Sequence, residues 1–160
     1  MTIDKLYILF LAQGQKITTD SRTISKREIF FALKGDNFDG NKYATKALEQ
    51  GAKYAIVDDP RLKDHEGVIL VEDVLKTLQE LALFHRRRLN IPIIAITGSN
   101  GKTTSKELIK NVLSKRFKVA ATKGNFNNHI GIPLTLLDIK AYDDISIVEM
   151  GANRQGEIES

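Results

Sequence analysis

The chain has 160 residues, of which 42% are hydrophobic and 28% charged, with a formal net charge of +4 and a pI of about 9.2. This composition predicts a globular protein with a substantial core. The absence of cysteine excludes a disulfide framework, a thiolate metal site and cysteine catalysis. Because no apolar run approaches the ~20 residues that span a bilayer and no signal peptide opens the chain, we expect a cytoplasmic protein without membrane insertion.

The sequence has one dense basic run, Arg86-Arg87-Arg88. The run closes a helical pattern, where basic side chains suit the helix dipole, and no aromatic residues interleave with it. It therefore predicts a solvated helix end and no nucleic-acid partner. His65, His85 and His129 lack the short spacing of helix-borne metal ligands, so we interpret them as ordinary surface or core-edge histidines.

The first half of the chain alternates helical and extended patterns. Helices are predicted at residues 2–12, 42–50 and 74–89, and strands at 29–33, 54–57 and 68–71. The polar segment Asp20-Ser21-Arg22 favours a turn after the first helix. This alternation predicts an α/β fold.

A loop with two glycines is predicted at residues 34–40. Its aromatic residue, Phe38, has two interpretations. It could cap the hydrophobic core above a plain turn, or it could stack on a planar base or sugar in a ligand loop, since glycines permit close backbone approach.

A domain boundary is predicted near residues 88–92, where the helix ends and a new strand begins. Beyond it the patterns predict strands at 93–96, 119–121 and 145–149, a helix at 102–117, and a helix over 131–137 that starts around Pro133. A nucleotide-binding sheet usually has about five or six strands. We therefore expect the second domain, residues 89–160, to be incomplete.

The segment Ile93–Thr104 combines a buried strand, a loop with Gly98 and Gly101, and a helix that opens at Lys102. These glycines allow backbone N–H groups to turn inward at the positive end of the helix and bind phosphate. Lys102 would contact the β- and γ-phosphate oxygens, and Thr103 would bind Mg²⁺. The first glycine of the usual phosphate-loop pattern is replaced by Ile96; a plain strand-to-helix turn is the simpler alternative.

A second chemical signal is Glu149, which ends the apolar run Ile145–Val148. Open α/β sheets bind ligands at the carboxyl ends of their strands, so Glu149 could hold Mg²⁺ opposite Thr103. A Glu149 side chain directed into the hydrophobic interior would contradict this hypothesis.

Several stretches together resemble the Mur ligases, ATP-dependent amide-forming enzymes of peptidoglycan synthesis. Residues 97–104 resemble the shortened phosphate loop of this family, and residues 124–135 and 149–153 resemble its last member, which adds D-alanyl-D-alanine. Asp20-Ser21-Arg22, residues 31–35 and residues 37–40 resemble the uridine-nucleotide-binding domain. This resemblance favours the ligand-loop interpretation of Phe38.

The resemblance implies that residues 1–88 bind the UDP-sugar and that residues 89–160 begin the central ATP-binding domain. Implied partners are ATP, Mg²⁺, UDP-N-acetylmuramoyl-tripeptide and D-alanyl-D-alanine, acting with a monomeric enzyme. The implied ATP site comprises Gly98, Ser99, Asn100, Gly101, Lys102, Thr103 and Thr104, with Lys102 and Glu149 catalytic and Thr103 and Glu149 on the metal. The implied substrate site comprises Ser21, Arg22, Asn37, Phe38, Asp39, Gly40, Asn127 and Asn128.

The family has longer chains with a third, C-terminal domain, so we expect these 160 residues to be inactive in ligation by themselves. Three alternatives remain open from the sequence. They are another ligase of the same family, a phosphate-loop kinase or nucleotide triphosphatase, and a non-catalytic uridine-nucleotide-binding module.

Overall fold

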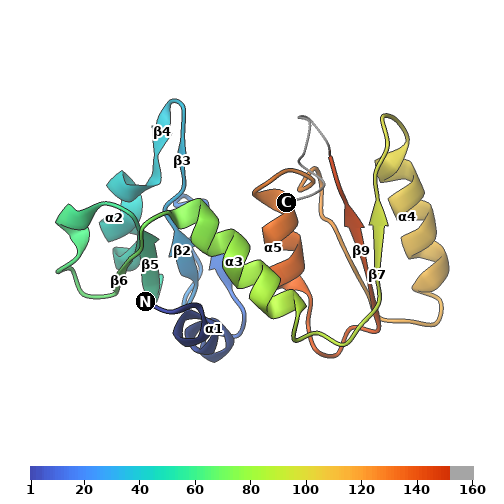
Figure 1. Ribbon diagram of the computed structural model, residues 1–160, viewed down its shortest axis with the longest axis horizontal. Helices are drawn as coiled ribbons and strands as arrows, with labels where there is room; N and C mark the ends of the chain where they lie inside the picture. Colours follow the sequence, from blue (N-terminus) through green and yellow to red (C-terminus); the bar gives the residue numbers. More distant parts are fainter. Residues whose placement is uncertain (152–160) are drawn as a thin grey trace. The chain divides into compact units, whose positions relative to one another are not determined.

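The computed structural model describes residues 1–151 (Figure 1). The chain divides into two compact units, Met1–Phe84 and a second that begins at His85. Strands and helices alternate in both units, and every paired strand of the two larger sheets is parallel, which confirms the predicted α/β class. Among the described residues no helix has the length and apolar character needed to cross a membrane.

The first unit contains a four-stranded sheet with the order β1-β2-β5-β6. Its strands are β1 (Ile17–Thr18), β2 (Ile29–Phe31), β5 (Tyr54–Val57) and β6 (Val68–Leu70). Its helices are α1 (Ile3–Ala12), α2 (Ala44–Glu49) and α3 (Val74–Arg86), with short 3₁₀ helices η1 (Gly40–Tyr43) and η2 (Pro60–Leu62). Strand β1 was not predicted, because two residues carry no readable pattern.

The central strands of this sheet are buried on both faces, as their uninterrupted apolar sequences require. Phe30 of β2 and Ala55 and Val57 of β5 form one core cluster with Ala44 and Ala47 of α2. Alternation along a strand directs Ile29, Phe31 and Ile56 to the opposite face, and these residues are fully buried too. The sheet is thus a well-packed layer, and the carboxyl ends of its strands lead into polar loops.

The predicted loop at residues 34–40 is a short antiparallel hairpin in the structure. Strand β3 (Lys34–Gly35) pairs with β4 (Phe38–Asp39). Gly40 closes the hairpin because its N–H donates to the carbonyl oxygen of Leu33 at 2.9 Å. A Cβ at this position would lie 2.6 Å from that oxygen, so the chain needs glycine here.

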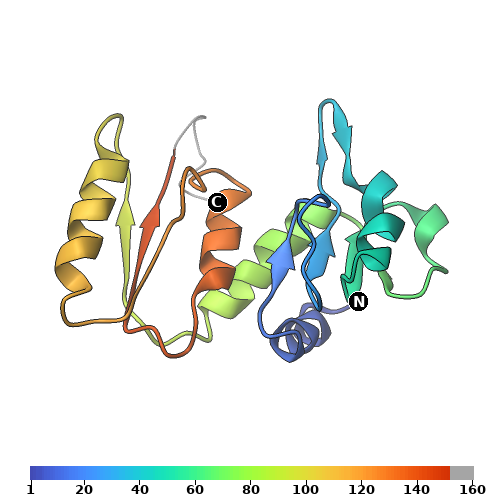
Figure 2. The same cartoon turned by 180° about the vertical axis from the view of Figure 1, so that it is seen from behind.

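The second unit contains a three-stranded parallel sheet with the order β7-β9-β8. Its strands are β7 (Ile93–Ile96), β8 (Val119–Ala121) and β9 (Ile145–Glu149), and its helices are α4 (Lys102–Leu113) and α5 (Gly131–Asp138). Helices α4 and α5 lie on opposite faces of the sheet (Figures 1 and 2). All three strands have the bounds that the sequence predicted.

Helix ends differ from the predictions by a few residues. Helix α4 ends at Leu113 and not at Phe117, because the next residues form turns, and α3 ends at Arg86 and not at residue 89. Helix α5 starts at Gly131, two residues before Pro133, because the Asn128 side chain accepts hydrogen bonds from the first backbone N–H groups. His85 is buried, with its Nε2 atom 3.0 Å from the carbonyl oxygen of Ile139, and burial lowers its pKa.

Gly131 supports a testable prediction about stability. A Cβ on Gly131 would lie 2.4 Å from two backbone atoms of Phe126, which no side-chain rotation can relieve. We expect Gly131→Ala to reduce the free energy of unfolding by about 3 kcal/mol, measured by urea denaturation. Gly35→Ala is the matched control, since a Cβ there meets nothing within 4 Å. Equal stability of the two variants would contradict the close approach.

Candidate functional site

The predicted phosphate loop is confirmed as a strand, a tight loop and a helix. Strand β7 ends at Ile96 and α4 begins at Lys102, with Gly101 at the N-cap. Gly98 and Gly101 have φ angles of +144° and +77°, which side chains with a Cβ rarely adopt. The loop is therefore built on glycine conformations, at the positive end of a twelve-residue helix.

The residues of the loop and of the first turn of α4 are exposed or half-buried. Lys102 folds back over the loop, and its ammonium donates to the carbonyl oxygen of Gly98 at 2.5 Å. Ser99, Asn100 and Thr104 are exposed. A lysine ammonium next to a helix N-terminus is an arrangement that suits an anion such as phosphate.

Thr103 and Glu149 meet at the carboxyl edge of the sheet, although they are 46 positions apart in sequence. The register of β7 and β9 pairs Ile96 with Glu149, so the end of β9 lies directly beside the phosphate loop. The Thr103 hydroxyl donates to the two carboxylate oxygens at 3.1 and 3.0 Å. Glu149 is only 2% exposed, and its carboxylate is directed at polar groups, namely the Thr103 hydroxyl, the Asn127 amide and a lysine ammonium of α4.

This donor set fits Mg²⁺, which prefers hard oxygen ligands and usually takes one or two carboxylates together with substrate phosphates. Within residues 1–151 no group of three or more acidic or histidine side chains could hold a metal. Thr103 and Glu149 would therefore hold Mg²⁺ together with phosphate oxygens and water.

The neighbouring residues Asn127 and Asn128 have different roles in the structure. The Asn127 amide donates to Oε1 of Glu149 at 2.9 Å, so this side chain belongs to the site. The Asn128 side chain accepts from the N–H groups of Ile130 and Gly131 and thereby caps α5. Ala152 and Asn153, the end of the predicted 149–153 motif, lie outside the described residues.

Two polar residues next to Glu149 were missed by the sequence reasoning. Lys106 of α4 is 1% exposed, and its ammonium lies 3.7 Å from Oε2 of Glu149. Thr122 is also buried, and its hydroxyl accepts from the backbone N–H of Glu149 at 2.9 Å. A lysine on an amphipathic helix gives no sequence signal of burial, so only the fold places it here.

A separate pocket of about 420 Å³ in the first unit brings together three of the predicted substrate residues. It is lined by Thr19, Asp20, Ser21, Arg22, Phe38 and Tyr43. The Arg22 guanidinium donates to both oxygens of Asp20 at 2.9 and 2.7 Å, and this contact lowers the pKa of Asp20 to about 2. The pair holds a cationic group at the pocket rim, where it can face an anion.

The aromatic side of this pocket is a stacked pair. The rings of Phe38 and Tyr43 are nearly parallel, with centroids 5.5 Å apart. Phe38 is 47% exposed, so the interpretation that it caps the hydrophobic core is wrong. An exposed pair of rings beside a cation suits a planar ligand that carries negative charge.

The other three predicted substrate residues of this unit do not line the pocket. Asn37 is exposed at the hairpin turn. The Asp39 carboxylate accepts from the backbone and side chain of Asn41, which lowers the pKa of Asp39 and begins η1. Gly40 closes the hairpin. These residues shape the hairpin that carries Phe38.

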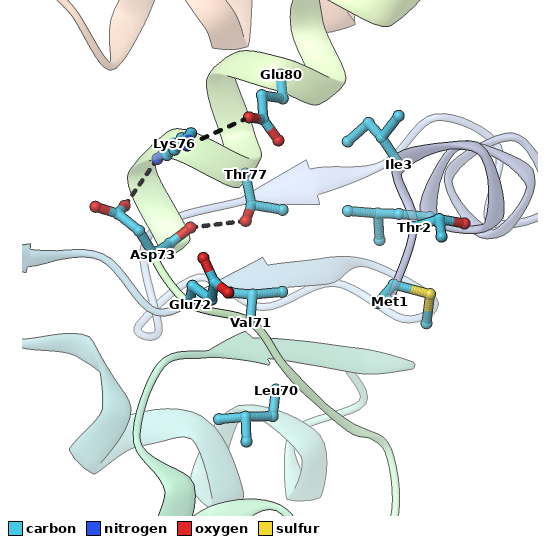
Figure 3. A pocket seen from close by; sticks show the side chains of 11 residues that line it. Met1, Thr2, Ile3, Leu70, Val71, Glu72, Asp73, Lys76, Thr77 and Glu80 are labelled. Carbon is cyan, nitrogen blue, oxygen red and sulfur yellow. Dashed lines mark hydrogen bonds and ion pairs between the residues drawn. The ribbon is translucent and has the colours of Figure 1, made fainter.

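Another pocket of the first unit, also about 420 Å³, lies between the starts of α1 and α3 (Figure 3). Some of its polar side chains interact with other residues that line the same pocket. The Thr77 hydroxyl donates to the carbonyl oxygen of Asp73, and the Lys76 ammonium lies 3.9 Å from Glu80. None of the predicted site residues lines this pocket.

Comparison with known families matches both units. Residues 15–95 match the model "Mur ligase family, catalytic domain", and residues 96–160 match "Mur ligase middle domain". The chain therefore belongs to the Mur ligase family.

Several similar relatives share one ligase name. The UDP-N-acetylmuramoyl-tripeptide–D-alanyl-D-alanine ligases of Bacillus subtilis and Escherichia coli are 41% and 39% identical to it, each over 89% of this chain. The crystal structure of MurF from Acinetobacter baumannii has a TM-score of 0.84 at 36% identity over 90% of this chain. MurF from Thermotoga maritima, solved in complex with ADP, has a TM-score of 0.81 at 33% identity over 91% of this chain.

The chain spans about a third of the length of these proteins. It covers 32% of the Bacillus subtilis ligase and 31% of the Escherichia coli ligase, and 32% and 34% of the two solved structures. The similarity thus concerns the two units described above.

Proposed function

We propose that this sequence is the substrate-binding and ATP-binding first part of a ligase that joins D-alanyl-D-alanine to UDP-N-acetylmuramoyl-tripeptide. Residues 1–88 would bind the uridine nucleotide, and residues 89–160 would begin the ATP-binding domain. The observation that carries the proposal is the contact of Thr103 with Glu149 beside the phosphate loop, because it joins the two chemical signals of the sequence in one site. The similarity to ligases of this kind supports the substrate assignment.

The proposed reaction activates a carboxylate with ATP. The terminal carboxylate oxygen of the tripeptide attacks the γ-phosphorus, the bond to the β–γ bridging oxygen breaks, and ADP leaves. The amine of D-alanyl-D-alanine then attacks the acyl phosphate, loses a proton, and expels inorganic phosphate from a tetrahedral intermediate. The protein contributes chiefly alignment and charge neutralisation.

The predicted site residues of the second unit would have distinct tasks in this scheme. The backbone of residues 98–101 and the N-terminus of α4 hold the phosphates, and the Lys102 ammonium neutralises charge on the β- and γ-oxygens. Thr103 and Glu149 would hold Mg²⁺, which, when bound, supplies charge neutralisation to the transferred phosphoryl group. Asn127 keeps the Glu149 carboxylate oriented by its 2.9 Å hydrogen bond.

The pocket of the first unit would hold the uridine diphosphate. Arg22 faces the diphosphate, Ser21 offers a hydroxyl, and the rings of Phe38 and Tyr43 face the planar base. An ATP-dependent enzyme acting on a nucleotide-linked precursor works in the cytoplasm, and we propose a cytoplasmic monomer. Calorimetric titration separates the alternatives: the ligase binds both Mg·ATP and UDP-N-acetylmuramic acid, a kinase only the first, and a uridine-binding module only the second.

The stacked pair gives a prediction for the first unit. We expect Phe38→Ala to weaken binding of UDP-N-acetylmuramic acid about tenfold in calorimetry, since base–aromatic stacking is worth about 1–3 kcal/mol. Phe117→Ala is the matched control, because Phe117 has a similar exposure, 43%, and lies in the second unit. Unchanged affinity in Phe38→Ala, or an equal loss in both variants, would remove the aromatic pair from the binding site.

A further inference from the structure

Lys106 is a lysine without access to solvent. It follows Thr103 by three positions on α4, so the two residues share one face of the helix. The Lys106 side chain is 1% exposed, although lysine is among the residues least often buried. A buried ammonium is costly unless charged or polar partners surround it.

The Lys106 ammonium has partners on the segment after β8, on β9 and on its own helix α4. It donates to the carbonyl oxygen of Thr122 at 2.8 Å and lies 3.7 Å from Oε2 of Glu149. A third partner, the carboxylate of Glu107 at 3.3 Å, is half exposed. The ammonium therefore links the segment after β8 to the last residue of β9.

Glu149 is held from two sides by this arrangement. The Thr122 hydroxyl accepts from its backbone N–H, and the Lys106 ammonium faces Oε2. On the other side, the Asn127 amide donates to Oε1 and the Thr103 hydroxyl donates to both oxygens. An apolar side chain at position 106 could fill the same space without a desolvation cost, but it would leave Oε2 without its cation.

We propose that Lys106 is a positioning residue for nucleotide binding. It fixes the Glu149 carboxylate in the orientation that faces Thr103 and the Mg²⁺ of Mg·ATP. The inference rests on the proposed function, because it acts only through Glu149 and the metal-bound nucleotide. Lys106 should therefore affect the affinity for the nucleotide when Mg²⁺ is bound, and it should not affect how the phosphate loop binds the nucleotide without metal.

The test is calorimetric binding of the non-hydrolysable analogue AMP-PNP to the full-length ligase that contains this sequence. We expect Lys106→Met to weaken binding about tenfold with Mg²⁺ present and to leave binding in EDTA within twofold of the unsubstituted protein. Lys110→Met, the same substitution one turn further along α4, is the matched control and should change neither value. In a Glu149→Gln background, Lys106→Met should cause no further loss.

Different outcomes separate the inference from the proposed function. If the unsubstituted ligase binds AMP-PNP no better with Mg²⁺ than in EDTA, the proposed function fails, and this inference fails with it. In another outcome, the unsubstituted ligase binds AMP-PNP better with Mg²⁺ than in EDTA, while Lys106→Met shows the same gain or loses affinity equally with Mg²⁺ and in EDTA. Either result overturns the Lys106 assignment alone. Should circular dichroism show Lys106→Met unfolded, Lys106→Gln, which keeps a donor for Thr122, replaces it with the same expected loss.

Discussion

Replacing Lys102 with alanine is expected to reduce ATP turnover by the full-length ligase at least about a hundredfold, the usual effect of removing one preorganised charge-stabilising donor. The Lys102 ammonium already lies over the phosphate loop, 2.5 Å from the Gly98 carbonyl oxygen. Because the charge on the transferred phosphoryl group is spread over its oxygens in the transition state, loss of this cation should lower kcat as well as affinity. The measurement is release of inorganic phosphate with both other substrates saturating.

Lys110→Ala is the matched control for this prediction. Lys110 lies on the same helix, two turns beyond Lys102, and outside the loop. The Lys102 variant should also keep its unfolding midpoint, since Lys102 is not part of the core. Undiminished turnover in Lys102→Ala would show that the loop is only a strand-to-helix turn, which is the simpler alternative weighed from the sequence.

The strands were predictable because each is a short apolar run between turn residues. Tyr54–Val57, Ile93–Ile96 and Ile145–Glu149 have the same bounds in sequence and structure. Strands of parallel sheets are read as nearly continuous apolar runs, so their limits are visible in the sequence even where a polar residue such as Ser146 of β9 is buried within the run. The hairpin at residues 34–39 was not predictable, because its pairing is set by Gly40 approaching the backbone of Ala32 and Leu33.

The candidate site likewise has residues that the sequence predicts and contacts that only the fold determines. Lys102 and Thr103 follow from the glycine pattern, and Glu149 follows from its place at the end of an apolar strand. Their contact depends on the register of β7 and β9, which a sequence pattern does not specify. The burial of Lys106 could not be predicted from the sequence, because it depends on α4 meeting the segment after β8 and the end of β9.

The second large effect is expected for Glu149→Gln, a nearly isosteric change that removes the charge and replaces one acceptor oxygen with an amide donor. Mg²⁺ is bound through one or two carboxylates together with phosphate oxygens, and Glu149 is the carboxylate that contacts Thr103. We expect turnover to fall at least about a hundredfold, with the Mg²⁺-dependent gain in ATP affinity lost and affinity in EDTA retained. Phosphate release and calorimetry with and without Mg²⁺ measure these two quantities.

The same variant should also be less stable, because among the described residues the half-exposed Glu107 would be the remaining carboxylate beside the Lys106 ammonium. A buried group that loses its counterpart costs about 1–3 kcal/mol, measurable by urea denaturation. Glu107→Gln removes the other carboxylate near Lys106, but at the surface, so it should change turnover and stability little. A Glu149→Gln enzyme that lost stability but kept its Mg²⁺-dependent turnover would make Glu149 a structural partner of Lys106 and would place the metal elsewhere.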